Sequence, residues 1–150
     1  MQDLKIKEIF SEHVNYSIDA LKQMFNGSFL ISNQDFQRDY FYDNKKASKI
    51  VESALLRFPL GTIYLNEEDS GVYSLIDGKQ RILSLMRFIN NEFPLFGLEI
   101  LDELNGKYFK DLDAQLKGRY ENSAISTVVI KKASHDQKRN IFLRVNQRFH

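Results

Sequence analysis

Apolar residues recur at helical spacing in three parts of the chain and predict three amphipathic helices. The strongest stripe covers residues 45–58, where apolar side chains fall at i, i+3, i+4, i+7, i+8 and i+11. A shorter stripe over residues 17–25 ends at Gly27, a residue type that commonly closes helices. A third stripe begins near Gly78 and extends to about Asn91. Each stripe needs an apolar partner, so the chain is expected to fold around a common core.

Short runs of β-branched and aromatic residues predict the strands. Residues 62–65 and 72–76 form two such runs, and the polar segment between them predicts a hairpin with a long turn. Further strands are expected at 28–31 and 125–131. Because helices and strands alternate along the chain, the pattern indicates an α/β or α+β domain.

The remaining segments carry weaker patterns. Residues 32–44 are polar with interspersed aromatic residues, which is typical of a loop. Residues 95–122 show little periodicity, and a helix around 109–116 is the one element predicted there. Ser134 is a suitable N-cap, so a last helix is expected from this residue through Arg148.

Length and composition exclude several classes of protein. The 150 residues suit one domain with a sizeable core. The absence of cysteine excludes disulfides, thiolate zinc sites and cysteine nucleophiles, and the three histidines are too scattered for metal-ligand spacing. No stretch approaches the ~20 apolar residues that span a bilayer, and the first residues lack a signal-peptide pattern. We therefore expect a cytoplasmic protein with no membrane contact.

Positive charge gathers toward the end of the chain. Residues 1–75 carry 8 Lys and Arg against 11 Asp and Glu, whereas residues 76–150 carry 13 against 9. A basic terminal helix is compatible with a DNA contact, and a solvated helix face is the alternative interpretation. The candidate DNA-binding residues are Lys131, Lys132, Arg139 and Arg144.

The segment Asp77-Gly78-Lys79-Gln80-Arg81 joins a strand to a helix and is the first candidate site. The unpaired N–H groups of a first helical turn favour an anion. Lys79 and Arg81 place two cations there, a conflict with the helix dipole that a bound phosphate would remove. Asp77 would then hold a metal ion or orient the arginine. On spacing alone, a simpler alternative is a helix cap, with Asp77 as N-cap and Gln80 completing a capping-box-like pair.

The loop Phe36-Gln37-Arg38-Asp39-Tyr40 is the second candidate site. Aromatic residues with one arginine and one amide suit stacking on a base and hydrogen bonds to phosphate or sugar. The alternative is a loop held by aromatic packing, with Arg38 paired to a neighbouring carboxylate.

Four segments follow one another along the chain: Gln-Arg-x-Tyr at residues 37–40, a helix-to-strand connection at 52–65, Asp-Gly-Lys-Gln-Arg at 77–81 and Phe-x-Arg-x-Asn within 141–146. In this order they resemble the segments of one family, the N-terminal domain of GmrSD-type modification-dependent restriction systems, which belongs to the ParB/sulfiredoxin-like superfamily. In that family the segment similar to residues 77–81 is an Asp-Gly-Gln-Gln-Arg signature. The resemblance covers residues 15–150.

Three features depart from the family pattern. Lys79 replaces the first glutamine of the signature, and Tyr42 stands where tryptophan is usual. Residues 147–149 lie where a glycine-rich turn is common. Family members continue into a helical region, so residues 1–150 are expected to be a single domain truncated at its C-terminal end.

The resemblance implies a ParB/sulfiredoxin-like α+β domain, a small mixed sheet flanked by helices. It also implies a nucleotide-binding, NTP-hydrolysing module of prokaryotic anti-phage defence that uses Mg²⁺. Such a module regulates DNA cleavage by a separate HNH-type nuclease domain or subunit, and no nuclease motif is present in this chain. The alternative, which Lys79 favours, is a non-enzymatic nucleotide or DNA sensor.

The resemblance assigns two groups of residues. The catalytic group consists of Asp77, which would also hold the metal, Gln80, which would position the attacking water, and Arg81. The nucleotide-binding residues are Gln37, Arg38, Tyr40, Gly78, Lys79 and Arg81.

Overall fold

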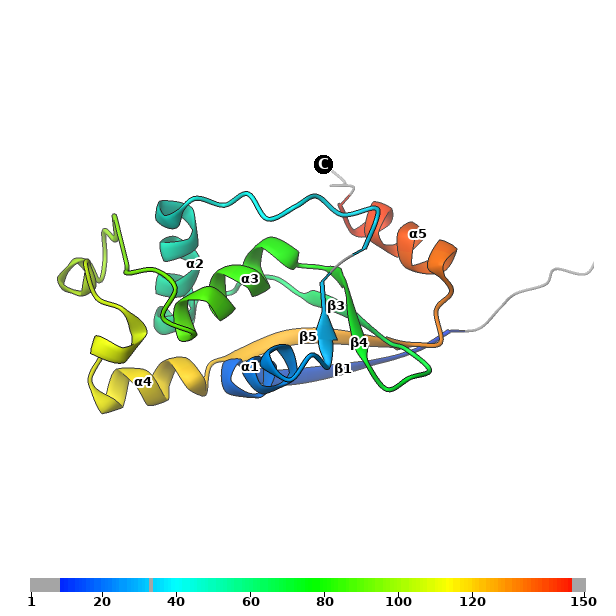
Figure 1. The fold of residues 1–150 in the computed structure, drawn as a ribbon, viewed down its shortest axis with the longest axis horizontal. Coiled ribbons are helices and arrows are strands. Elements are labelled where there is room, and N and C mark those ends of the chain that lie inside the picture. Colours follow the sequence, from blue (N-terminus) through cyan, green and yellow to red (C-terminus); the bar gives the residue numbers. More distant parts are fainter. Residues whose placement is uncertain (1–8, 33, 147–150) are drawn as a thin grey trace, which may run out of the picture.

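The computed structural model describes residues 9–32 and 34–146 and contains one five-stranded mixed sheet flanked by helices (Figure 1). The strands are β1 (Phe10–Ser17), β2 (Leu30–Ile31), β3 (Ile63–Glu67), β4 (Tyr73–Asp77) and β5 (Ala124–Lys131). The α-helices are α1 (Ile18–Asn26), α2 (Asn44–Leu56), α3 (Lys79–Ile89), α4 (Ala114–Glu121) and α5 (His135–Asn146). Two 3-10 turns, η1 (Asp102–Leu104) and η2 (Phe109–Asp111), precede α4. The α+β class and the sheet flanked by helices are confirmed.

The sheet has the strand order β1-β5-β3-β4-β2. β1 is antiparallel to β5, β5 is parallel to β3, and β2 is parallel to β4. β3 and β4 form the predicted antiparallel hairpin. Its register shifts near the end of β4: Tyr64 lies opposite Asp77 but Leu65 lies opposite Leu75, so Ile76 is an extra, bulged residue. Such bulges bend a strand and redirect the side chains that follow.

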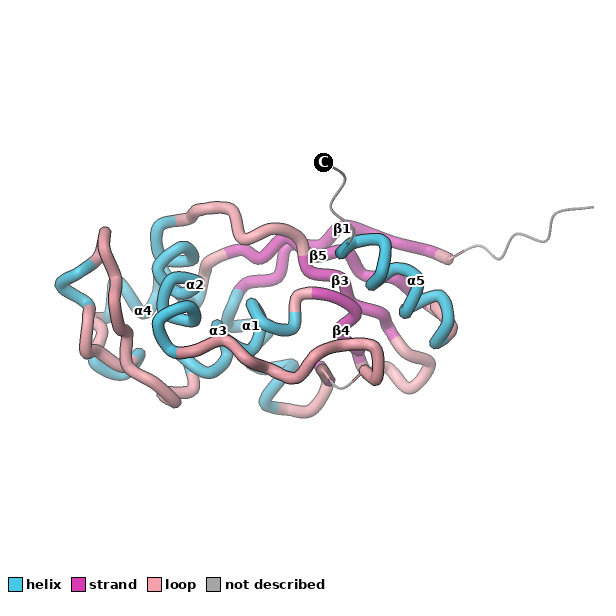
Figure 2. Tube along the Cα trace, turned by 90° about the horizontal axis from the view of Figure 1, so that it is seen from above, coloured by secondary structure: helices cyan, strands magenta, loops and turns pink. Residues whose placement is uncertain are grey.

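The two faces of the sheet are covered by different helices. Successive strand residues point to opposite faces. Leu65 and Leu75 belong to the main core with residues of α1–α4, whereas Tyr64 and Ile76 pack in a smaller cluster with Phe142 of α5. Figure 2 shows α5 at the opposite end of the molecule from α2 and α4. α5 therefore packs on the sheet through a small apolar cluster that is separate from the main core.

The structure corrects two sequence predictions. β1 was not predicted, because as an edge strand it is largely exposed and only Val14 and Tyr16 mark an apolar alternation. The helix expected at 109–116 begins later, since Asp113 caps α4 by accepting a hydrogen bond from the Leu116 N–H at 2.8 Å. The predicted Ser134 cap is confirmed, and the end expected for that helix, Arg148, lies outside the described residues. Within residues 9–32 and 34–146, every helix is too short or too polar to cross a bilayer.

Candidate functional site

An open cleft of about 1110 Å³ lies at the start of α3 and brings the two candidate segments together. The loop before α2 passes the start of α3 (Figure 1). Its Phe36 ring lies 5.1 Å from that of Phe142 on α5. The polar residues that line the cleft are Gln37, Arg38, Thr62, Asp77, Lys79, Gln80, Arg81 and Asn146. Of the predicted nucleotide-binding residues, Tyr40 is the one outside this lining.

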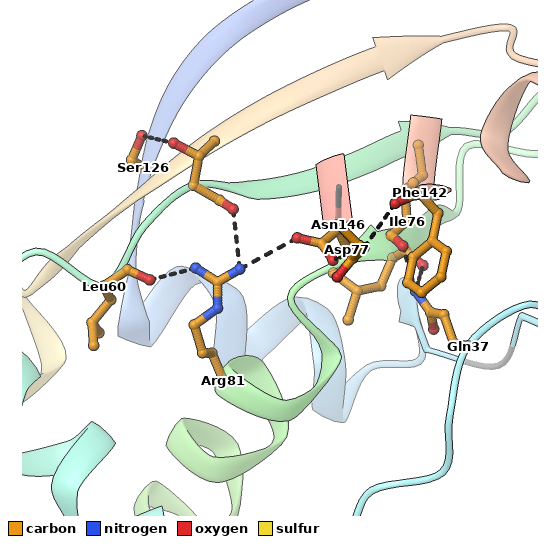
Figure 3. Close-up of polar contacts among 10 residues, drawn as sticks. Gln37, Leu60, Ile76, Asp77, Arg81, Ser126, Phe142 and Asn146 are labelled. Carbon is orange, nitrogen blue, oxygen red and sulfur yellow. Dashed lines mark hydrogen bonds and ion pairs between the residues drawn. The ribbon is translucent and has the colours of Figure 1, made fainter. Parts of the chain in front are cut away.

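Asp77 does not cap α3, so the capping alternative is wrong. The N-cap of α3 is Gly78, and no side chain of residues 9–32 and 34–146 caps this helix. The Asp77 carboxylate instead accepts a hydrogen bond from Asn146 Nδ2 at 3.0 Å and pairs with Arg81 Nη2 at 3.4 Å (Figure 3). The bulge at Ile76 directly precedes Asp77 and accounts for this orientation. The first turn of α3 thus lines the cleft without a side-chain cap.

Position 78 requires glycine for two reasons: its backbone conformation and the closeness of the Ile63 side chain. Its φ is +106°, a left-handed conformation that is costly for other residues. A Cβ atom at this position would overlap the Ile63 side chain. The glycine therefore allows the turn that presents the start of α3 to the cleft.

Arg81 is held by main-chain carbonyls. Its Nη1 donates to Leu60 O, and its Nη2 donates to Thr62 O at 3.3 Å (Figure 3). The close approach requires Gly61, which has a φ of +77° and whose hypothetical Cβ would lie 2.6 Å from Arg81 Nη1. The guanidinium also pairs with Asp77. Arg81 is therefore a positive charge held in place by the protein, and part of its five N–H donors is already used in these bonds.

The loop with Gln37 and Arg38 is tied to the strand and the helix beside it. Gln37 Nε2 donates to Leu75 O at 2.7 Å and to Ile76 O at 2.6 Å. Gln80 bonds the main chain of the same loop through both ends of its amide. Arg38 is exposed and lines the cleft, and within residues 9–32 and 34–146 it has no hydrogen bond or ion pair. The alternative in which Arg38 pairs with a carboxylate thus finds no support in the described residues.

Tyr40 faces away from the cleft. Its hydroxyl lies 3.0 Å from Ser84 Oγ and accepts from Arg87 Nη1 at 3.0 Å. The aromatic side chains of this loop that line the cleft are instead Phe41, which is 59% exposed, and Tyr42, and Tyr64 and Phe142 join them from β3 and α5. The motif predicted an aromatic residue at the site but placed it one or two positions too early.

Asn146 is a site residue that the sequence did not single out. It lies in the segment similar to the family's Phe-x-Arg-x-Asn pattern, which is the signal that could have found it. Its Nδ2 donates to Asp77 Oδ1 and also to Phe142 O at 2.7 Å. α5 thus contributes a polar side chain to the start of α3, from the far end of the sequence.

α5 is anchored by a polar cluster around Glu68. Lys138 Nζ lies 2.6 Å from Glu68 Oε1, and Ser74 Oγ and Asn66 Nδ2 each donate to the same carboxylate at 2.8 Å. Burial alone would raise the pKa of Glu68, but these hydrogen bonds and the Lys138 charge outweigh it and hold the pKa below its ordinary value. The anchor is therefore strongest with Glu68 ionised.

Acidification is expected to loosen this anchor. A carboxyl with a lowered pKa in the folded state contributes stability above its unfolded pKa, and this contribution is lost as the pH falls through the folded pKa. We expect Glu68→Gln to lose about 1–3 kcal/mol of unfolding free energy at neutral pH, and the difference from wild type to shrink as the pH falls through the lowered pKa of Glu68. Urea denaturation of wild type and Glu68→Gln at neutral and at acidic pH measures this difference in unfolding free energy.

A matched control distinguishes this anchor from surface charge. Glu67 lies 3.7 Å from Lys131 in a more exposed pair, so Glu67→Gln should change stability by less than ~1 kcal/mol. Equal losses for the two variants at neutral pH would contradict the anchor.

Two of the four predicted DNA-binding residues, Arg139 and Arg144, point to different sides of α5. Lys131 lies 3.8 Å from Glu12 and 3.7 Å from Glu67. Arg139 and Arg144 are exposed on α5, but five helical positions turn them about 140° apart. Lys132 is exposed in the preceding turn.

The cleft offers few ligands for a metal ion. Among the described residues, its one acidic lining residue is Asp77. Across the part of the chain that the structure describes, no group of three or more His, Asp or Glu residues is placed to hold a metal. One carboxylate fits a Mg²⁺ ion whose other ligands are water and phosphate oxygens.

Comparison with known proteins adds one finding. A family model described as the GmrSD restriction endonuclease N-terminal domain matches residues 19–149. A comparison with curated proteins finds no significant match. The match covers most of the chain and includes both segments that meet at the cleft. The chain therefore belongs to the family of GmrSD restriction endonuclease N-terminal domains, which makes it a component of a restriction system.

Proposed function

We propose that this domain binds and hydrolyses a nucleoside triphosphate in the cleft, and that this controls DNA cleavage by an HNH-type nuclease domain or subunit of the same system. The observation that carries the proposal is the charge around the start of α3. Arg38, Lys79 and Arg81 line the cleft against one acid, Asp77. Like charges gathered at the positive end of a helix repel one another, and a polyphosphate would relieve that repulsion.

The cleft lining includes apolar as well as charged residues, which suits a nucleotide. Phe41, Tyr42, Ile50 and Leu60 make one part of the lining apolar, and Phe41 is 59% exposed. Aromatic faces stack on nucleobases. We place the base against Phe41 and the phosphates at the start of α3.

Asp77 and Arg81 are the residues that we assign to hydrolysis. Mg²⁺ would arrive with the triphosphate, and Asp77 would supply its protein ligand. In the reaction, a water oxygen bonds to the γ-phosphorus, the bond to the β,γ-bridging oxygen breaks, and a proton leaves to solvent. Arg81, fixed by Leu60 O and Thr62 O, would stabilise the negative charge that develops on the phosphate oxygens.

A nucleotide sensor without turnover is the second candidate function. Two observations favour it: Lys79 stands in place of the family's glutamine, and both Asp77 oxygens already have protein partners. Calorimetric titration of the four Mg·NTPs, run beside a phosphate-release assay, separates the two. Binding with phosphate release supports hydrolysis, binding alone supports the sensor, and absence of binding overturns both.

Lys79→Gln tests the departure from the family signature. The half-buried Lys79 lines the cleft, so its loss should weaken Mg·NTP binding by about tenfold, the effect of removing one charge near the phosphates. Titration calorimetry measures this change. Unchanged affinity would place the phosphates elsewhere. Phosphate release gained by the variant but missing in wild type would identify this chain as a sensor.

A further inference from the structure

The loop over the cleft is paired with the side chain of Gln80. The Gln80 Oε1 accepts from the Phe41 N–H at 3.0 Å, and its Nε2 donates to Asp39 O at 3.1 Å. The two main-chain groups are two residues apart, the spacing at which one residue of a parallel strand pairs with its neighbour. The Gln80 amide thus pairs with this loop as a neighbouring strand would.

A second amide ties the loop on the other side of Arg38. Gln37 Nε2 donates to the consecutive carbonyls of Leu75 and Ile76, at 2.7 and 2.6 Å. Ile76 is the bulged residue of β4, and a bulge disrupts the regular hydrogen bonding of a strand. The loop is therefore fixed to β4 before Arg38 and to α3 after it.

Arg38, between these two attachments, is the one exposed cation of the cleft whose side chain has no partner within residues 9–32 and 34–146. Lys79 and Arg81 line the same cleft, so the loop would lower its electrostatic energy by moving Arg38 away. The attachments oppose that movement. A side chain held in place before binding loses less entropy when the ligand arrives.

We infer that Gln37 and Gln80 are positioning residues that hold the loop so that Arg38 contacts the bound phosphates. The inference rests on the proposed function and replaces the water-positioning role that the family resemblance implies for Gln80. A glutamine that orients the attacking water needs a free amide, whereas both ends of the Gln80 amide bond the loop. Gln80 acts on the phosphates through Arg38.

A double-mutant cycle with a ligand that has no base tests this. Mg²⁺ with inorganic tripolyphosphate is titrated into wild type, Gln80→Met, Arg38→Ala and the double variant. Methionine keeps the length and helix propensity of glutamine but lacks the amide. Arg38→Ala should weaken binding about tenfold and Gln80→Met about fivefold, and the double variant should bind no more weakly than Arg38→Ala. Gln37→Met should show the same non-additivity.

Hydrogen exchange tests the attachment without any ligand. Gln80→Met should speed exchange of the Phe41 amide, which has lost its acceptor. Gln115→Met, on the exposed surface of α4 and outside the cleft lining, is the matched control and should change neither exchange nor affinity.

The outcomes separate the inference from the proposed function. Unchanged exchange at Phe41, or losses that add in the double variant, would overturn the inference while wild-type binding upholds the function. Tripolyphosphate affinity retained by Gln80→Met together with lost phosphate release from NTP would also overturn it, in favour of a water-orienting glutamine. No binding by wild type would overturn the proposed function and Arg38's part in it, and exchange would still decide whether Gln80 holds the loop.

Discussion

Arg81→Ala is expected to weaken Mg·NTP binding at least a hundredfold, and to abolish any phosphate release. The variant removes the one cation of the cleft that the protein itself fixes, through Leu60 O, Thr62 O and Asp77. It also leaves the Asp77 carboxylate facing the phosphates without its counter-charge. Hydrogen bonds to charged groups contribute about 1.5–3 kcal/mol each, and one or two lost bonds suffice for this change. Titration calorimetry and phosphate release measure the two effects.

Two comparison variants make the Arg81 result interpretable. Arg139→Ala removes an exposed arginine of α5 outside the cleft lining and should leave affinity unchanged. Arg81→Lys keeps the charge but cannot reach both carbonyls with a planar fork, so its affinity should fall between those of wild type and Arg81→Ala. Wild-type affinity in Arg81→Ala, with the fold intact by circular dichroism, would contradict the placement of the phosphates.

Elements that bury an apolar face were predictable from the sequence. The stripes over 45–58 and 78–91 correspond to α2 and α3, and the two β-rich runs correspond to the β3–β4 hairpin. These segments fold against the main core, so their periodicity records burial. β1 was not predicted because it is an exposed edge strand, and few of its residues need to be apolar.

The members of the site were more predictable than their orientations. The family resemblance implied that the Arg38 loop and the start of α3 contribute to one site, and residues of both segments line the cleft. The direction of the Asp77 side chain depends on a bulge at Ile76, which is a property of the β3–β4 register. Spacing alone favoured a helix cap, because the sequence of an Asp before a Gly at a helix start is the same whether or not the Asp caps the helix.

The contribution of α5 required tertiary information. Asn146 is far from Asp77 in sequence, and the two meet because the Lys138–Glu68 pair and the Phe142 cluster seat α5 on the hairpin that carries Asp77. Tyr40 and Phe41 show the same limit at close range. Adjacent side chains of one loop point to different sides, and partners on α3 decide which of them reaches the cleft.

Phe88→Ala is expected to cost about 3–5 kcal/mol of unfolding free energy, the usual range for a buried phenylalanine. Phe88 on α3 is fully buried, and its ring lies 5.8 Å from that of Phe93, 6.0 Å from that of Phe109 and 5.5 Å from that of Tyr120. Truncation leaves a cavity at the point where α3, η2 and α4 meet. Urea denaturation measures the loss.

The Phe88 variant also tests whether the core and the cleft are energetically separate. Phe96→Ala is the control, because Phe96 is 59% exposed and its removal should cost less than ~1 kcal/mol. Phe88 lies nine residues after Lys79, about 13 Å along α3 from the phosphate end. Where Phe88→Ala remains folded, Mg·NTP affinity should therefore stay within about twofold of wild type. A large fall in affinity of the folded variant would show that the start of α3 depends on packing at its far end, and a stability loss equal to that of Phe96→Ala would contradict the aromatic core itself.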